Sequence, residues 1–279
     1  MAMGRWIGGT QYLRALLFAV AAAMPFGAPA QAQTLESIRY AGGARHTLDV
    51  YRPDRRGAPV IVFIYGGSWQ NGDKATYSFL GRSLAQRGYL TVIPNYRVYP
   101  EVRYPSFLED AAKAVRWARA NAARFGGDAN NIYLAGHSAG AYNAAMLAYD
   151  PRWLRAVGLS PNQIAGFIGL AGPYDFLPLR DETLATIFGG ANRRDTQPIT
   201  YASRRVPPSL LLVGGLDTTV EPGNSSRLAK ALRAAGNQVT LRRYAAVGHI
   251  AILGGFGTPL EVVAPVRGDI DTIVAATRR

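Results

Sequence analysis

Residues 131–149 read NIYLAGHSAGAYNAAMLAY. Residues 131–135 are a short, mostly apolar run that favours a buried strand, and the alanine-rich residues 141–149 favour a helix. Between them stands Gly136-His137-Ser138-Ala139-Gly140, with a serine at a tight strand-to-helix turn flanked by glycines. Such a turn exposes the serine hydroxyl at the positive end of the helix dipole, so Ser138 is predicted to be a nucleophile.

A serine hydroxyl is a weak nucleophile at neutral pH and needs a base to take its proton. The chain has three histidines. His46 lies far upstream, and His137 shares the strained turn with Ser138, so its side chain is expected to point elsewhere. His249 follows the last predicted strand in a loop that can return to the serine. By elimination, His249 is the predicted base.

The imidazole of such a base is oriented by a carboxylate, which should follow a strand between the serine and the histidine. The buried strand 209–213 is followed by two glycines and then by Asp217, which is the predicted acid. Glu221, four residues further on, is the alternative. Asp217 could instead serve only to cap the turn that follows it.

The oxyanion of an acyl-transfer intermediate needs backbone N–H donors. One is expected from Ala139, the residue after the nucleophile, and the others from Gly67 and Ser68, which follow a buried strand upstream. Four aromatic residues near these positions are candidate walls of a substrate pocket, although such residues more often lie in the core: Trp69, Tyr96, Tyr174 and Phe176.

Along the rest of the chain, short apolar runs alternate with amphipathic ones, which is typical of a mostly parallel sheet covered by helices. The predicted class is α/β, with a central sheet of about eight strands flanked by helices. Strands are expected at 46–51, 59–65, 90–93, 131–135, 164–170, 209–213 and 238–244, and helices at 78–87, 105–125, 141–149, 225–235 and 269–276. Residues 33–279 are predicted to form one catalytic domain, with loops or a small cap at 172–207.

These residues resemble those of the α/β-hydrolase family, and more narrowly the branch of hormone-sensitive-lipase-like carboxylesterases, feruloyl-esterase-like proteins and aryl-formamidases. One departure is Tyr65, which stands where the family's glycine motif usually begins with histidine. The segment before His46 also lacks a large helical cap, which implies an open pocket. The motifs that carry the resemblance are 48–53, 65–69, Gly72-Asp73-Lys74, Asn95-Tyr96-Arg97, Glu109-Asp110 with Trp117, 136–140, Asp217 and Gly248-His249.

The resemblance implies a serine hydrolase that cleaves small acyl or aryl esters through an acyl-enzyme, with no cofactor and no metal. The alternatives are an aryl-formamidase, which is an amidase with the same machinery, and a non-catalytic binding protein on a hydrolase scaffold. The chain has no cysteine, which excludes a thiol nucleophile, disulfides and cysteine-ligated metals. The net charge is +13, but the basic residues are scattered, so no nucleic-acid partner is expected.

The first 32 residues are predicted to be a secretory signal peptide rather than a lasting membrane span. They combine a positive start with an apolar run that is shorter than the roughly 20 residues a spanning helix needs. The mature chain is expected to begin near Gln33, in the periplasm or secreted. The supporting features are Arg5 and Arg14, the apolar run 15–23, and an A-x-A cleavage site at Ala30-Gln31-Ala32.

Overall fold

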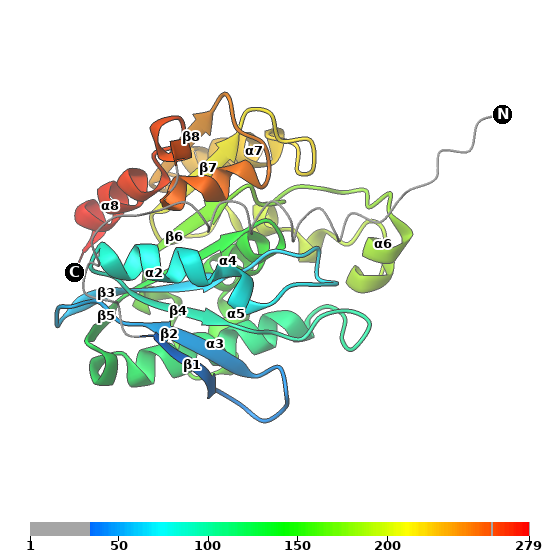
Figure 1. Ribbon diagram of the computed structural model, residues 1–279. Coiled ribbons are helices and arrows are strands. Elements are labelled where there is room, and N and C mark those ends of the chain that lie inside the picture. Colours follow the sequence, from blue (N-terminus) through cyan, green and yellow to red (C-terminus); the bar gives the residue numbers. More distant parts are fainter. Residues whose placement is uncertain (1–33, 258, 279) are drawn as a thin grey trace. The chain divides into compact units, whose positions relative to one another are not determined.

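The computed structural model describes residues 34–257 and 259–278, so the predicted signal peptide lies outside the described residues. The described chain forms an eight-stranded sheet in the order β1-β2-β4-β3-β5-β6-β7-β8 (Figure 1). Strand β2 is antiparallel to both of its neighbours, and every other neighbouring pair is parallel. The predicted α/β class and strand number are therefore confirmed.

The parallel strands at the centre of the sheet are buried on both faces. Every residue of β3, β6 and β7 is buried, as expected for apolar runs covered by helices on each side. The strand bounds are β1 Thr34–Arg39, β2 Thr47–Tyr51, β3 Ala58–Ile64, β4 Leu90–Pro94, β5 Gly127–His137, β6 Ile164–Leu170, β7 Ser209–Gly214 and β8 Val239–Tyr244.

Helices cover both faces of this sheet. Helices α2 (Ser78–Gln86) and α8 (Val266–Thr277) pack with the turn η6 (Ala251–Phe256) on one face. Helices α3 (Ser106–Asn121), α4 (Ala139–Tyr149) and α5 (Pro151–Ala156) pack together on the other. The remaining helices are α6 (Glu182–Phe188) and α7 (Gly223–Ala234), and the short 3-10 turns are η1 Lys74–Tyr77, η2 Ala123–Phe125, η3 Pro161–Gln163, η4 Arg194–Thr196, η5 Pro198–Tyr201 and η7 Pro259–Val262.

Most predicted elements occur at the expected places, with two differences. The edge strand β1 was not predicted, because its residues are mostly exposed and show little apolar alternation. The helix expected over 105–125 ends at Asn121, and its last turn becomes the separate η2 that stops at the left-handed Gly126. The segment 172–207 holds α6, η4 and η5 between loops.

The search for membrane-spanning helices, made on the described residues, found none that is both long and apolar enough to cross a bilayer.

Candidate active site

Ser138 lies between the carboxyl end of β5 and the start of α4. Strand β5 is one of the inner strands of the sheet (Figure 1). The backbone of Ser138 has φ 55° and ψ −126°, a conformation that non-glycine residues rarely adopt. The strain turns the side chain out of both elements. A β-carbon on Gly136 would lie 2.3 Å from the carbonyl oxygen of Gly140, so the first glycine of the motif is required by the tightness of the turn.

The second glycine of the motif allows α4 to approach strand β3. A β-carbon built on Gly140 would lie 2.0 Å from the carbonyl oxygen of Ile64 at the end of β3. This is a clash with backbone, which cannot rotate away as a side chain can. Gly140→Ala is therefore expected to lower the free energy of unfolding by about 3 kcal/mol or more, since over-packing forces backbone shifts.

Urea unfolding of the two proteins measures this loss. The matched control is Gly268→Ala in α8, where an added β-carbon meets nothing within 4 Å. That change is expected to leave stability unchanged or to raise it by up to about 1 kcal/mol, because alanine favours a helix over glycine. Equal stability of the Gly140→Ala variant and wild type would contradict the close approach of α4 to β3.

Ser138, His249 and Asp217 form a continuous hydrogen-bonded line. The Nε2 atom of His249 lies 2.9 Å from Ser138 Oγ, and its Nδ1 atom lies 2.8 Å from Asp217 Oδ2. These residues follow β5, β8 and β7, whose carboxyl ends meet at the same edge of the sheet. Ser138 is 9% exposed and Asp217 5%, so the line is largely withdrawn from water. The structure thus brings together the three residues predicted from the sequence.

The carboxylate of Asp217 is held at both oxygens. Its Oδ1 accepts the backbone N–H groups of Thr219 at 2.9 Å and Val220 at 2.8 Å, which leaves Oδ2 for His249. Burial by itself would raise the pKa of Asp217, but the hydrogen bond to His249 and the two backbone donors outweigh it and hold the pKa below its usual value. Asp217 therefore stays ionised opposite the imidazole.

Glu221, the alternative acid, lies elsewhere. Its side chain is 70% exposed and its Oε2 is 3.4 Å from the guanidinium of Arg227. It makes no recorded contact with His249 within the described chain, so the geometry favours Asp217 over Glu221.

Residues 65–69, called the glycine loop below, pass beside the nucleophile. A β-carbon on Gly66 would lie 2.9 Å from Ser138 Cβ, and one on Gly67 would lie 2.1 Å from the carbonyl oxygen of Asn71. Gly67, Ser68 and Trp69 all have positive φ, at 138°, 53° and 58°. Ala139 begins α4, so its N–H has no acceptor inside the helix. The glycine loop and the start of α4 therefore both lie next to the serine.

Tyr65, which replaces the family's usual histidine, is a buried support of the glycine loop. Its ring stacks on Tyr96, with 4.7 Å between ring centroids, and its carbonyl oxygen accepts the Tyr96 hydroxyl at 2.9 Å. The Nη2 atom of Arg45 donates to the Tyr65 hydroxyl at 3.0 Å and to the Gly72 carbonyl at 2.8 Å, while Nε donates to the Tyr96 carbonyl at 2.9 Å. Arg45, which sequence reasoning missed, thus joins three segments behind the loop.

Three of the four predicted pocket residues, Trp69, Tyr96 and Tyr174, prove to be core residues. Tyr96 and Tyr174 have no exposed surface, because one is stacked beneath the glycine loop and the other is packed against Phe167. This placement corrects the prediction that they line an open pocket. Trp69 is 3% exposed, and its ring lies parallel to that of the half-buried Phe176 at 6.1 Å. Of the four, Phe176 alone offers substantial surface to a substrate.

Several other motif residues support the fold rather than the chemistry. Lys74 pairs with the buried Asp49 at 2.7 Å, and its backbone N–H donates to Asn95 Oδ1 at 2.8 Å. Asp110, fully buried on α3, accepts the guanidinium of Arg97 at 2.7 and 2.8 Å. His46 pairs with the same carboxylate at 2.9 Å, so it lies away from Ser138, as its position in the sequence suggested.

His137 supports the loop that carries His249. Its Nε2 atom is 2.9 Å from the carbonyl oxygen of His249, and since that oxygen can only accept, Nε2 carries the proton. Burial, together with the neighbouring His249 ring, lowers the pKa of His137 to about 3. The side chain thus stays neutral at ordinary pH and serves as a fixed donor.

This depressed pKa links the stability of the protein to pH. In the unfolded chain a histidine takes a proton near pH 6.5, whereas folded His137 does so only near pH 3. The stability that it contributes is complete above about pH 6.5 and is lost, at up to about 1.4 kcal/mol per pH unit, as the pH falls toward 3. His137→Gln, which keeps an N–H donor, is expected to remove this dependence.

Urea unfolding at pH 7 and pH 5 tests the expectation. From pH 7 to pH 5, the free energy of unfolding of wild type should fall by about 2 kcal/mol more than that of the His137→Gln variant. Equal losses in both proteins would show that another group causes the acid sensitivity.

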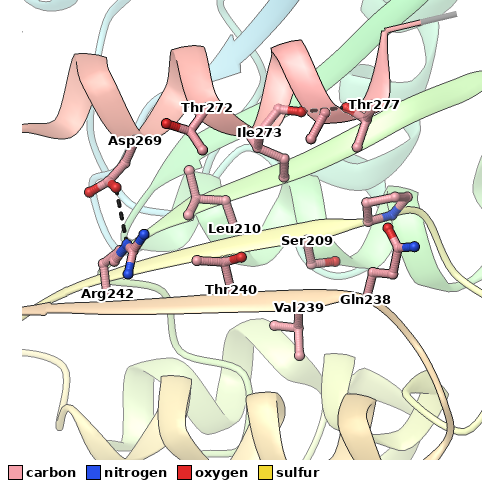
Figure 2. Close-up of a pocket in the computed structure, with 12 residues that line it drawn as sticks. Ser209, Leu210, Gln238, Val239, Thr240, Arg242, Asp269, Thr272, Ile273 and Thr277 are labelled. Atoms are coloured by element: carbon pink, nitrogen blue, oxygen red, sulfur yellow. Dashed lines mark hydrogen bonds and ion pairs between the residues drawn. The ribbon is translucent and has the colours of Figure 1, made fainter.

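The cleft in Figure 2 is separate from this site. It is lined by residues at the start of β7 and β8 and on α8, among them Ser209, Val239 and Ile273. Asp217 follows the other end of β7, and none of the three hydrogen-bonded residues lines the cleft.

Comparisons with known proteins agree with this architecture. The family described as BD-FAE matches residues 48–232. The chain is similar to the isoprenylcysteine alpha-carbonyl methylesterase ICME of Arabidopsis thaliana, at 30% identity over 86% of this chain and 60% of that protein. It is also similar to the esterase LipC of Mycobacterium tuberculosis, at 30% identity over 76% of this chain and 58% of that protein. The chain therefore spans about three fifths of the length of these curated relatives.

Solved structures show the same fold. A truncated carbohydrate esterase from gut microbiota superimposes with a TM-score of 0.73 at 21% identity, over 86% of this chain and 96% of that one. The propionate-bound esterase Est2 of Thermogutta terrifontis superimposes with a TM-score of 0.73 at 25% identity, over 88% and 94%. These likenesses confirm the predicted α/β-hydrolase fold, and the family match and the named relatives confirm the resemblance to its esterase branch.

Proposed function

The chain belongs to the BD-FAE family, and on that premise we propose that it is a serine carboxylic-ester hydrolase acting on small acyl or aryl esters. The observation that carries this proposal is the hydrogen-bonded line of Ser138, His249 and Asp217 beside the glycine loop. The names of its relatives, which include esterases and a methylesterase, support the same bond type.

The proposed reaction begins when Ser138 Oγ attacks the ester carbonyl and His249 Nε2 takes the hydroxyl proton. The charge that develops on the carbonyl oxygen is stabilised by backbone N–H groups of Gly67, Ser68 and Ala139. His249 then returns the proton to the departing alcohol, which leaves an acyl-serine. A water molecule, deprotonated by the same imidazole, releases the acid and restores Ser138.

Asp217 has an electrostatic and orienting role in this proposal. Its ionised carboxylate accepts the Nδ1 proton of His249, so that Nε2 is left unprotonated and faces Ser138. It also stabilises the imidazolium that forms in each half of the reaction.

The preference for small esters is supported by the crowding around the glycine loop. The Trp69 ring meets Phe188 at 4.8 Å and Phe176 at 6.1 Å between centroids, so aromatic side chains already occupy the space on that side of the loop. The related esterase Est2 was solved with propionate bound, which is a short-chain carboxylate.

Hydrolysis of a series of p-nitrophenyl esters from acetate to decanoate, together with hydroxycinnamoyl esters, tests the proposal. We expect the highest kcat/KM on the short acyl or the aryl esters, and labelling of Ser138 by a fluorophosphonate probe. A folded protein that hydrolyses none of these esters and leaves Ser138 unlabelled would instead be the non-catalytic binding protein considered from the sequence.

N-formylkynurenine belongs in the same series, because the motif around Gly66, Gly67 and Trp69 also resembles aryl-formamidases. The same Ser138, His249 and Asp217 could cleave either an ester or a formamide, so the ratio of the two kcat/KM values decides between them. A higher value on the formamide would replace the esterase proposal with the formamidase one.

We also propose that residues 1–32 are a signal peptide, so that the mature chain begins near Gln33 outside the cytoplasm. Mass spectrometry of the protein from its native cell envelope measures the N-terminus directly. An intact Met1 in a cytoplasmic fraction would contradict export, and would favour the formamidase alternative.

A further inference from the structure

We propose that Asn143 and Trp69 form a positioning pair that holds the glycine loop in a fixed position relative to the nucleophile Ser138. The inference rests on the proposed ester hydrolysis and adds two residues to its machinery. Neither is proposed to touch the reacting atoms. Their task is to keep the N–H donors of the loop aimed at the developing oxyanion.

The first observation is the strain in the glycine loop. Ser68 and Trp69 have φ of 53° and 58°, so two consecutive residues with side chains occupy the left-handed region. For a bulky aromatic residue this conformation is a genuine outlier. Strained backbone persists only where surrounding contacts over-determine it, and it gathers at functional sites. Something therefore has to hold Trp69 in place.

The second observation is what holds it. The Trp69 ring lies edge-on to Tyr142 at 5.0 Å and to Phe188 at 4.8 Å, and its backbone carbonyl accepts the N–H of Tyr99 at 2.7 Å. Its indole N–H donates to Asn143 Oδ1 at 3.0 Å, in a buried hydrogen bond. The aromatic contacts pack around the ring, and the hydrogen bond adds a directional restraint to that packing.

The third observation is where Asn143 stands. It lies on α4, five residues after Ser138, in a helix whose every residue is buried. The single Trp69–Asn143 bond therefore ties the loop that carries the predicted oxyanion donors to the helix that begins at the nucleophile. A rotation of one against the other would change the distance between the N–H groups and the substrate carbonyl.

The fourth observation is that the Asn143 amide makes this bond at a cost. Asn143 has no exposed surface, and within the described part of the chain its Nδ2 atom has no hydrogen-bond partner. The indole N–H can only donate, so it orients the amide with Oδ1 inward and leaves Nδ2 unsatisfied. A buried unsatisfied donor costs free energy, so Asn143 satisfies the indole N–H of Trp69 while one of its own groups stays without a partner in the described residues. Within the described residues, the hydrogen bond that the Asn143 side chain makes is thus the one that positions Trp69.

The test uses the variants Asn143→Leu and Trp69→Phe, singly and together, with p-nitrophenyl acetate as substrate. Each single change is expected to lower kcat/KM about tenfold to hundredfold, less than the 10²–10³-fold lost when an oxyanion donor is removed outright. The loss should fall on kcat, with KM changed by less than about twofold, because the donors act on the transition state. The double variant should be no slower than the slower single one, because both changes break the same bond.

A trifluoromethyl ketone supplies a readout that general loss of structure would not move. It forms a tetrahedral adduct with a nucleophilic serine, so its inhibition constant reports the alignment of the oxyanion donors. With rates corrected for the fraction of protein labelled by a fluorophosphonate, the inhibition constant should rise by the same factor by which kcat/KM falls.

The matched control is Tyr149→Phe, at the other end of the same helix. It removes the buried hydrogen bond between the Tyr149 hydroxyl and Ser209 Oγ, 2.8 Å long, which has no connection with the glycine loop. This variant is expected to melt at a lower temperature than wild type with kcat and the inhibition constant unchanged.

The proposed positioning role would be refuted if both single variants kept kcat/KM within about twofold of wild type. It would also be refuted if the corrected rate fell while the inhibition constant stayed the same. If Asn143→Leu fails to fold, Trp69→Phe, which keeps an aromatic ring in the cluster, decides the question. An inactive, unlabelled wild-type protein would refute the proposed function itself, whereas an active wild type with unaffected variants would refute only the pair.

Discussion

Replacing Ser138 by alanine is expected to lower kcat by about 10⁶-fold, the loss seen when the serine of a comparable triad is removed. Without the hydroxyl no acyl-enzyme can form, and His249 loses the proton it is placed to accept at 2.9 Å. Alanine is smaller than serine and meets the same restriction at φ 55°, so the turn itself should be retained. Hydrolysis of p-nitrophenyl acetate measures the loss, and the melting temperature verifies the fold.

Ser226→Ala is the matched control, because Ser226 is an exposed serine on α7 whose hydroxyl, among the described residues, donates to the backbone carbonyl of Pro222 at 3.4 Å. It should keep the wild-type rate. If the Ser138→Ala variant kept a tenth of the esterase rate, the assignment of Ser138 as nucleophile would be abandoned.

The second large effect is expected from Asp217→Asn, which should lower kcat about 10⁴-fold, as the equivalent change does in a serine protease. The backbone N–H groups of Thr219 and Val220 bind the Oδ1 position and would hold the amide oxygen there. The amide nitrogen would then face His249 and donate to Nδ1. This forces the imidazole proton onto Nε2, which can no longer accept from Ser138.

Glu221→Gln is the companion variant for this prediction. Glu221 is exposed and paired with Arg227, so its neutralisation should change kcat by less than about twofold. A large loss in the Glu221→Gln variant with a small one in Asp217→Asn would show that the loop after β7 rearranges and that Glu221 is the acid.

The core of the site follows from short-range patterns in the chain. A strand, a glycine-flanked serine and a helix occur within residues 131–149, and the backbone strain at Ser138 is a property of that turn alone. Asp217 and His249 each follow a predicted strand, and the carboxyl ends of neighbouring parallel strands meet at one edge. Their approach to Ser138 was therefore predictable from the order of elements along the chain.

The roles of the aromatic residues were not predictable in this way. Tyr96 and Tyr174 follow strands just as Ser138, Asp217 and His249 do. Yet Tyr96 stacks beneath the glycine loop and Tyr174 lies in the core. Position after a strand indicates the edge of the sheet but not the direction of a large ring. That direction depends on which rings from distant segments fill the same space.

The amino-acid sequence alone determined the α/β fold, the strained serine turn and the order of the residues that meet there, because each is encoded in periodicity and glycine spacing over a few neighbouring residues. The sequence also shows that Asn143 is unusual, because it is a polar residue in the otherwise mostly apolar run 139–149. Only the tertiary structure showed its partner, since Trp69 lies 74 residues away in the chain. The same holds for Arg45 and the Tyr65 hydroxyl, because a hydrogen bond between distant segments forms only after the sheet has brought them together.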